Sequence, residues 1–123
     1  MITIQNGTID DFFDSAMETA KQIDNNEKLT PKHTIWMETE DLLSILKPQR
    51  TKLIQYLRNK TKVYYSSLLH ELKKSPASLN KDLDLLLKYQ LIDILKEPNN
   101  GHGIKKVIKP LYTNESIEFK AVV

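Results

Sequence analysis

The chain has 123 residues, which fits one domain with short extensions, and 40% of them are hydrophobic, enough for a packed core. It contains no cysteine, which excludes disulfides and thiolate metal sites and favours a reducing compartment. Neither a signal-peptide pattern nor a run of about 18 apolar residues occurs in the sequence. We therefore expect a cytoplasmic protein that does not contact a membrane.

The charges are strongly segregated along the chain, although the net charge is only +2. Residues 1–45 hold three lysines and nine acids, a net −6, whereas residues 46–112 hold fourteen Lys or Arg and five acids, a net +9. Residues 113–123 contribute −1. A basic body behind an acidic head is the distribution expected when the middle of a chain meets phosphate groups. Chance clustering on solvated faces is the alternative.

The first elements expected in chain order are a strand at 1–5, a helix at 9–24, a loop, an extended run at 33–37 and a helix at 39–46. Thr8, followed three residues later by Asp11, has the pattern of a helix N-cap. Trp36, the one tryptophan, is expected to anchor the core. Thr39 is expected to cap the helix that follows it.

Three more helices are expected at about 48–59, 66–74 and 76–89. Ser66 or Ser67 is expected to cap the second, and Ser75 with Pro76 to end it and start the third. One side of the third helix is apolar, with Leu79, Leu83, Leu86 and Leu87. Its opposite sector is polar or small, with Ala77, Lys81, Asp84 and Lys88, flanked by Ser78 and Leu85. A helix of this kind, carried on a short helix pair, is typical of one that enters a major groove.

A β-hairpin is expected next, with strands at 91–96 and 104–109 around a turn-rich loop. The loop holds Asn99, Asn100, Gly101 and Gly103, residue types that accept the positive φ values of a tight turn. Lys105 and Lys106 follow its tip, and His102 lies beside them. A last strand, at 116–123, alternates apolar and polar residues and is expected to pair with residues 2–5.

The predicted fold class is therefore α+β: a winged helix-turn-helix with an N-terminal strand-helix extension and a C-terminal strand. We divide the chain into an acidic extension at 1–38 for dimerisation or partner binding, a DNA-binding domain at 39–112 and a strand segment at 113–123. The sequence offers no P-loop and no G-x-S-x-G, its three histidines are far apart, and Asp82 and Asp84 diverge by about 200° on one helix. We therefore expect no enzyme activity, no metal and no cofactor.

The order of helix pair, third helix and basic hairpin predicts sequence-specific binding to double-stranded DNA. The helix at 76–89 is expected to read the major groove, and the wing at 97–106 to contact phosphates or the minor groove. The residues expected at base edges are Ala77, Ser78, Asn80 and Lys81. Those expected at phosphates are Lys73, Lys74, Lys88, Lys105 and Lys106, and Ser66 and His102 complete the candidate site.

Three stretches of the chain show patterns of residue class that recur in one protein family. They are Glu40-Asp41-Leu42-Leu43-Ser44-Ile45-Leu46-Lys47-Pro48-Gln49-Arg50, continuing through Leu53-Ile54-Gln55-Tyr56-Leu57; Leu79-Asn80-Lys81-Asp82-Leu83, followed by Leu91-Ile92; and Ile117-Glu118-Phe119-Lys120-Ala121. With these stretches the chain resembles a family of MarR-like winged-helix regulators. The resemblance covers about residues 33–121. The family is associated with toxin-antitoxin pairs of the TumE/TumA type, so the resemblance implies an antitoxin that represses its own operon. It also implies a cognate toxin, held by the acidic N-terminal region.

The leading hypothesis is thus a homodimeric transcriptional repressor, with dimers suited to two half-sites one helical turn apart. Two alternatives stay open. One is a winged-helix module that binds only protein, and the other is a MarR-like regulator that senses a small ligand and has no toxin partner.

Overall fold

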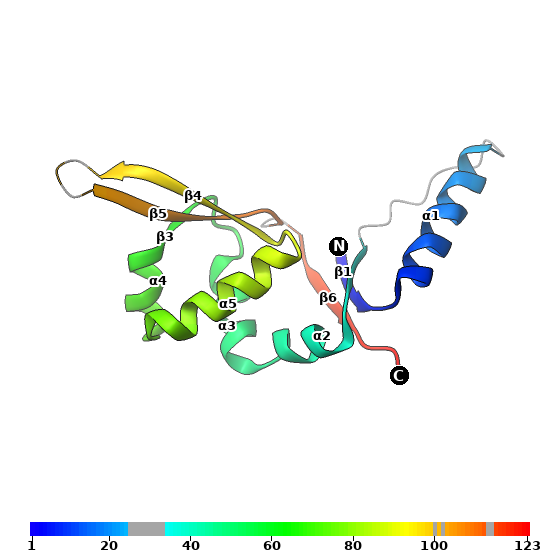
Figure 1. Cartoon of the computed structure of the whole chain (residues 1–123), viewed down its shortest axis with the longest axis horizontal. Coiled ribbons are helices and arrows are strands. Elements are labelled where there is room, and N and C mark those ends of the chain that lie inside the picture. Colours follow the sequence, from blue (N-terminus) through cyan, green and yellow to red (C-terminus); the bar gives the residue numbers. More distant parts are fainter. Residues whose placement is uncertain (25–33, 100, 102, 113–114) are drawn as a thin grey trace. The chain divides into compact units, whose positions relative to one another are not determined.

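The computed structural model describes residues 1–24, 34–99, 101, 103–112 and 115–123. The fold is α+β, and these residues form five helices and six strands in two three-stranded sheets (Figure 1). They fall into two compact units, the first made of residues 1–44 and 115–123 and the second of residues 45–114. The loop expected after the helix at 9–24, with His33, and the turn residue Asn100 lie outside the described residues.

The first unit is built on a parallel sheet. Its central strand β1 (Ile2–Asn6) lies between β2 (Thr34–Met37) and β6 (Ile117–Lys120), and the helix α1 (Ile9–Asp24) lies between β1 and β2 in the chain (Figure 1). The expected pairing of the last strand with residues 2–5 is confirmed, with Ile2 opposite Ile117 and Ile4 opposite Phe119. Ile2 and Ile4 are fully buried and form the core of this sheet.

Local contacts explain how α1 begins. The Thr8 N–H donates to Asp11 Oδ2 at 2.8 Å and the Asp11 N–H to Thr8 Oγ1 at 3.3 Å, which confirms the expected cap. Just before it, a Cβ added to Gly7 would lie 2.4 Å from Trp36 Cε3, so any side chain at this position would require the indole to move. Trp36 is half-buried rather than a core anchor, because it occupies the sheet face opposite to Ile4.

Asn6 ties three segments of the first unit together. Its Nδ2 donates to Thr39 Oγ1 at 3.1 Å and to the Val122 carbonyl at 2.8 Å, and its Oδ1 accepts from the Val122 N–H at 2.6 Å. The prediction that Thr39 caps a helix is wrong, since Thr39 is the first residue of α2 (Thr39–Ile45) and the Leu42 N–H bonds to the Glu38 carbonyl one position earlier.

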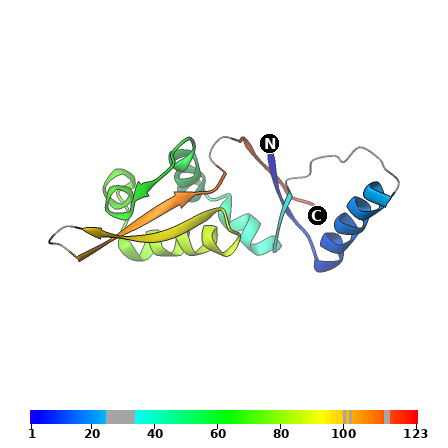
Figure 2. The same ribbon diagram turned by 90° about the horizontal axis from the view of Figure 1, so that it is seen from above.

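The second unit combines three helices with an antiparallel sheet. The elements are α3 (Pro48–Leu57), β3 (Val63–Tyr64), α4 (Tyr65–Leu72), α5 (Pro76–Lys88), β4 (Ile92–Asn99) and β5 (Gly103–Pro110). The strand order is β3-β5-β4, and β4 pairs with β5 along its whole length, from Ile92 opposite Pro110 to Asn99 opposite Gly103. Seen from above, the hairpin lies across the helices, with α5 along one side and α3 and α4 along the other (Figure 2).

The core of the second unit explains why these helices form. Apolar side chains from every helix and strand are buried: Leu53, Leu57, Val63, Leu68, Leu79, Leu83, Leu86, Leu91, Ile92, Val107 and Ile108. Leu87, expected on the buried side, is 39% exposed, because Leu83 and Leu86 define the inward direction of α5. The strand β3 was not predicted, and it leads directly into α4 at Tyr65, so Ser66 and Ser67 lie inside the helix and neither caps it.

Candidate nucleic-acid interface

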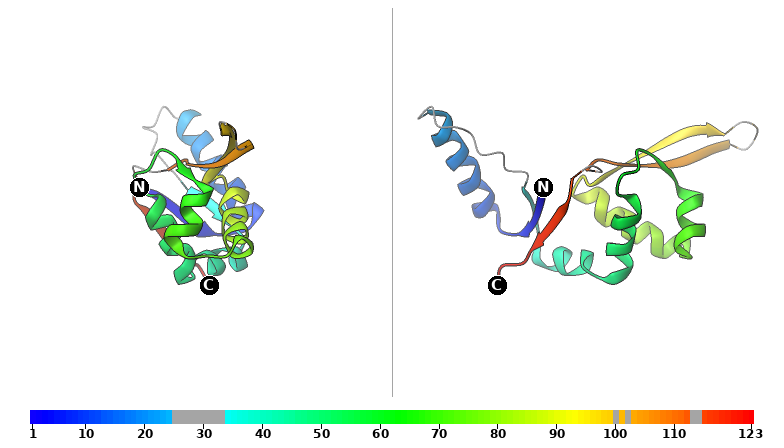
Figure 3. Two further views of the ribbon diagram at one scale, coloured as in Figure 1. Left: turned by 90° about the vertical axis from the view of Figure 1, so that its left-hand side faces the viewer. Right: turned by 180° about the vertical axis from the view of Figure 1, so that it is seen from behind.

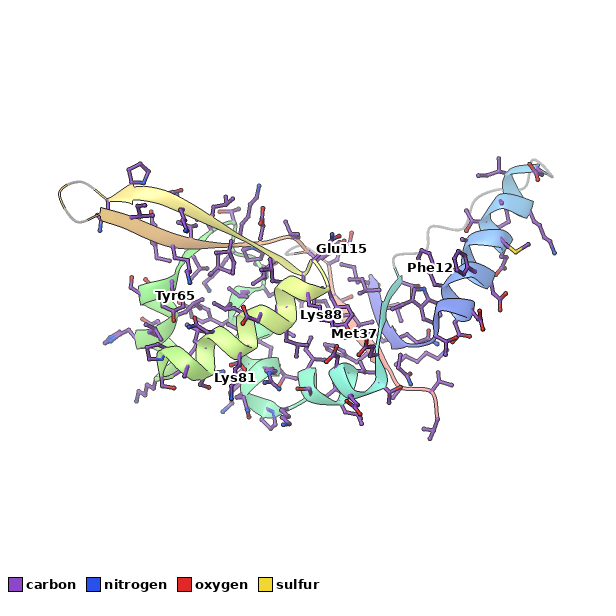
Figure 4. The ribbon with its side chains drawn as sticks, in the orientation of Figure 1. Phe12, Met37, Tyr65, Lys81, Lys88 and Glu115 are labelled. Atoms are coloured by element: carbon purple, nitrogen blue, oxygen red, sulfur yellow. The ribbon has the colours of Figure 1, made fainter. Side chains whose placement is uncertain are left out.

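The outer side of α5 carries the residues expected to read bases. Ala77, Lys81 and Lys88 are exposed along one stripe, whereas Leu79 and Leu83 are buried on the other side. Figure 4 labels Lys81 and Lys88 on α5. The expected start of the helix is confirmed, since Ser75 Oγ accepts from the Ser78 N–H at 3.2 Å and Pro76 follows Ser75. At about 100° per residue, Ser78 and Asn80, both exposed, lie on opposite flanks of the stripe.

Tyr65 connects the start of α5 to the hairpin. Its hydroxyl donates to Asn80 Oδ1 at 2.9 Å, and Lys106 Nζ of β5 lies 4.9 Å from the centre of its ring. One side chain from α4 therefore contacts both an exposed polar residue of α5 and a lysine of the hairpin. Figure 4 labels Tyr65 on α4 and Lys81 on α5.

A second tyrosine holds the other hairpin lysine. Lys105 Nζ lies 5.0 Å from the ring centre of Tyr64, and Lys62 Nζ lies 5.4 Å from the same ring. Lys62 also donates to Glu97 Oε1 at 2.7 Å, and this hydrogen bond raises the pKa of Lys62 above its ordinary value. Exposed cation–π contacts of this kind contribute little to the stability of the fold, but they favour one direction of the lysine side chains.

A buried charge cluster joins α3, α5 and the turn between α4 and α5. The Asp82 side chain, only 2% exposed, accepts from Arg50 Nε of α3 at 2.9 Å and from Lys74 Nζ in the turn between α4 and α5. Lys74 Nζ also donates to the Gln49 carbonyl at 3.1 Å. The Lys74 amine therefore bonds to groups within the protein. Lys73, by contrast, is exposed at the left-handed C-cap of α4.

Most of the candidate residues lie in the second unit, but they do not form a single cluster there. Ser66 is exposed in the first turn of α4. Lys88 lies in the last turn of α5, eleven residues from Ala77, or about 16 Å along the axis, with its Nζ 5.4 Å from the ring centre of Tyr89. His102 lies outside the described residues. The strand ends nearest to it, at 99 and 103, extend past α4 (Figure 3).

Sequence reasoning missed Tyr64, Tyr65, Arg50 and the buried role of Asp82. For the two tyrosines the available signal was the β-prone run from Val63 to Tyr65, which forms β3 and ends at the first residue of α4. Nothing local marks Asp82, because it lies on the flank of α5 and meets partners on two other elements.

Two further observations concern metal ligands and membrane-spanning helices in the part of the chain that the structure describes. There, no three Asp, Glu or His side chains gather in a way that would hold a metal ion. Nor does any described helix have the length and apolarity to cross a bilayer. Comparison of the chain with protein-family models, with curated proteins and with solved structures gives no match.

Proposed function

We propose that the protein binds double-stranded DNA as a winged helix-turn-helix, with α5 in the major groove and the β4–β5 hairpin as the wing. The observation that carries this proposal is the contact chain from Asn80 through Tyr65 to Lys106. It connects the exposed start of α5 to Lys106 of the hairpin, and a helix and a wing that contact the same duplex need such a shared surface.

The proposed site makes two kinds of contact, one to base edges and one to phosphates. Asn80 and Lys81, on the exposed side of α5, suit base edges, since an amide and an amine offer donors to N7, O6 and O4 acceptors. Lys105 and Lys106, exposed on β5, suit phosphates, which set position without reading sequence. Lys74 acts in this proposal by holding the turn between α4 and α5, because Asp82 and Gln49 occupy its amine.

Regulation by a dimer and by a protein partner is the second part of the proposal. The helix α1, on which Figure 4 labels Phe12, carries acidic side chains and exposed apolar ones, namely Phe12, Phe13, Met17 and Ile23. Exposed apolar groups of this size on one helix are typical of a protein contact. We propose a homodimeric repressor in a toxin-antitoxin pair, whose acidic first unit holds a basic toxin.

Substitutions of individual lysines test the DNA-binding proposal. A preferred duplex is first selected from a random library, and dissociation constants are measured by fluorescence anisotropy over a range of salt concentrations. Lys81→Ala is expected to weaken binding to the preferred duplex by about 1–3 kcal/mol and to leave binding to a random duplex nearly unchanged. The double substitution Lys105→Ala with Lys106→Ala is expected to weaken binding to both duplexes. It is also expected to reduce the slope of log K against log salt, the salt slope, by about 2.

The control is Lys21→Ala, which removes the same charge from α1 in the first unit. Equal loss on both duplexes for Lys81→Ala would refute its base-reading role. Duplex binding that is absent from the wild-type protein, or insensitive to salt, would favour a module that binds only protein.

A further inference from the structure

An open pocket lies beside the turn between α4 and α5. It has a volume of about 580 Å³ and is lined by Pro48, Gln49 and Lys52 of α3, by Leu72, Lys73 and Lys74, and by Ser75 and Ser78 at the start of α5. Among these lining residues three are lysines and none is acidic. The pocket therefore favours an anionic group, and it has room for one far larger than a water molecule.

Two features hold this lining in place before any ligand arrives. Asp82 and the Gln49 carbonyl fix the Lys74 amine in the floor, where the side chain is only 11% exposed. The Ser75 hydroxyl accepts from the Ser78 N–H and keeps its own proton for another acceptor. Lys52 and Lys73 are exposed and supply two ammonium groups to the same pocket. Such a set resembles the mixed hydroxyl and ammonium donors that hold phosphate oxygens.

The pocket lies on a definite side of α5. Ser78 lines it, and Ser78 and Asn80 stand about 80° to either side of the stripe of Ala77, Lys81 and Lys88. Asn80 belongs to the flank that meets Tyr65 and the hairpin. The stripe is therefore bounded on one side by Tyr65 with Lys106 of the hairpin and on the other side by the pocket. A helix about 10–12 Å across fills a major groove about 12 Å wide, so phosphates line it on both sides.

We propose that this pocket holds one phosphate group, and that in the DNA complex it is a backbone phosphate on the groove wall away from the hairpin. The assignment of the phosphate to DNA rests on the proposed function, whereas the preference of the pocket for a phosphate group does not. This proposal adds three pocket residues, Gln49 and Lys52 of α3 and Ser75, to those already assigned to DNA contact.

The salt dependence of duplex binding tests the source of the phosphate. The variants are Lys52→Gln with Lys73→Asn, where Asn is chosen because it accepts the left-handed backbone at residue 73. Loss of one phosphate contact reduces the slope of log K against log salt by about 0.9. We expect that reduction for the double variant, since both lysines serve one phosphate, and about 1.8 for Lys52→Gln with Lys73→Asn and Lys105→Gln. The matched control is Lys21→Gln with Lys120→Gln, which removes two charges from the first unit.

Titration with sodium phosphate, against sodium chloride at equal ionic strength, tests the pocket without DNA. We expect the amide NMR signals of Gln49, Ser75 and Ser78 to shift in the wild-type protein and not in the double variant. Those shifts with an unchanged salt slope would support a phosphate site but assign it to a free phosphate compound. No shifts and no change in slope would overturn the proposal. If the wild-type protein binds no duplex, the proposed function fails while the titration still decides the pocket.

Discussion

At the scale of single residues, Tyr65 decides what Asn80 presents to a ligand. An exposed asparagine side chain offers both an acceptor and two donors. Here the Tyr65 hydroxyl donates to Asn80 Oδ1 at 2.9 Å, which orients the amide and leaves Nδ2 to face outward. In the proposed function Tyr65 is therefore a positioning residue, and the Asn80 amide it orients would suit bases that offer an acceptor in the major groove.

Tyr65→Phe removes only this hydroxyl and keeps the ring under Lys106. A net hydrogen bond is worth about 1 kcal/mol, so we expect affinity for the preferred duplex to fall about fivefold. Affinity for a random duplex and the salt slope stay as in the wild type, because no phosphate contact is lost. Anisotropy titrations of both duplexes measure this, with Tyr64→Phe as the matched control. A parallel loss on the random duplex would contradict the positioning role.

The exposed residues of α5 were predictable because helical periodicity alone places Ala77, Lys81 and Lys88 on one face. The contact between Tyr65 and Asn80 was not, because it joins residues fifteen positions apart on different helices. Leu87 shows the limit of periodicity at a boundary, since it is 39% exposed at the edge of the apolar sector. The local sequence pattern predicts which side of a helix a residue lies on, whereas its contact partners depend on how the helices and strands pack together.

At the scale of elements, Asp82 makes α3, α5 and the turn between α4 and α5 depend on one another. Its carboxylate accepts from Arg50 and Lys74, whose side chains are 13% and 11% exposed. A largely buried group with two cationic partners is costly to remove, because the cations stay behind in a site with little water. The orientation of α5 against the other helices therefore depends on a single acidic side chain.

Asp82→Asn is expected to lower the free energy of unfolding by about 3–5 kcal/mol, measured by urea denaturation. Asp84→Asn, two residues along the same helix and exposed, is the control and is expected to change it by less than about 0.5 kcal/mol. Similar values for the two variants would show that the charge cluster does not hold the helices together.

Most helices and strands were predictable because their signals are local. Pro48 and Pro76 each begin a helix as expected, and Thr8 with Asp11 starts α1. The strand β3 was missed because its two residues are too few to show alternation, and it exists only through pairing with β5. The caps expected at Thr39 and Ser66 were wrong for a related reason: the preceding strands run almost directly into the helices.

At the scale of the whole molecule, the charge segregation follows the two structural units. Residues 1–44 with 115–123 hold four lysines and eleven acids, a net −7, and residues 45–114 carry +9. The DNA-contacting surface proposed here lies entirely within the basic unit. The acidic unit carries the exposed apolar side chains of α1, so the proposed dimer or partner contact and the proposed DNA contact belong to different units.

Phe13→Ser with Met17→Ser is expected to convert a dimer to a monomer in sedimentation-velocity experiments, since both side chains are more than half exposed on α1. Binding to a duplex with two half-sites is expected to weaken as the dimer is lost, while binding to a single half-site persists. Asp14→Asn, on the same helix, is the control and should keep the wild-type mass. A dimer that survives the double substitution would place the interface elsewhere.

The pairing of β1 with β6 has a consequence for synthesis on the ribosome. The basic unit is one continuous stretch, so it has all its strands and helices as soon as residue 114 has emerged. The acidic unit begins the chain yet lacks its third strand and the Asn6 contacts to Val122 until residues 115–123 have followed. Residues 1–44 therefore complete their unit only after residues 115–123 have followed, and until then β1 has no partner on its β6 side.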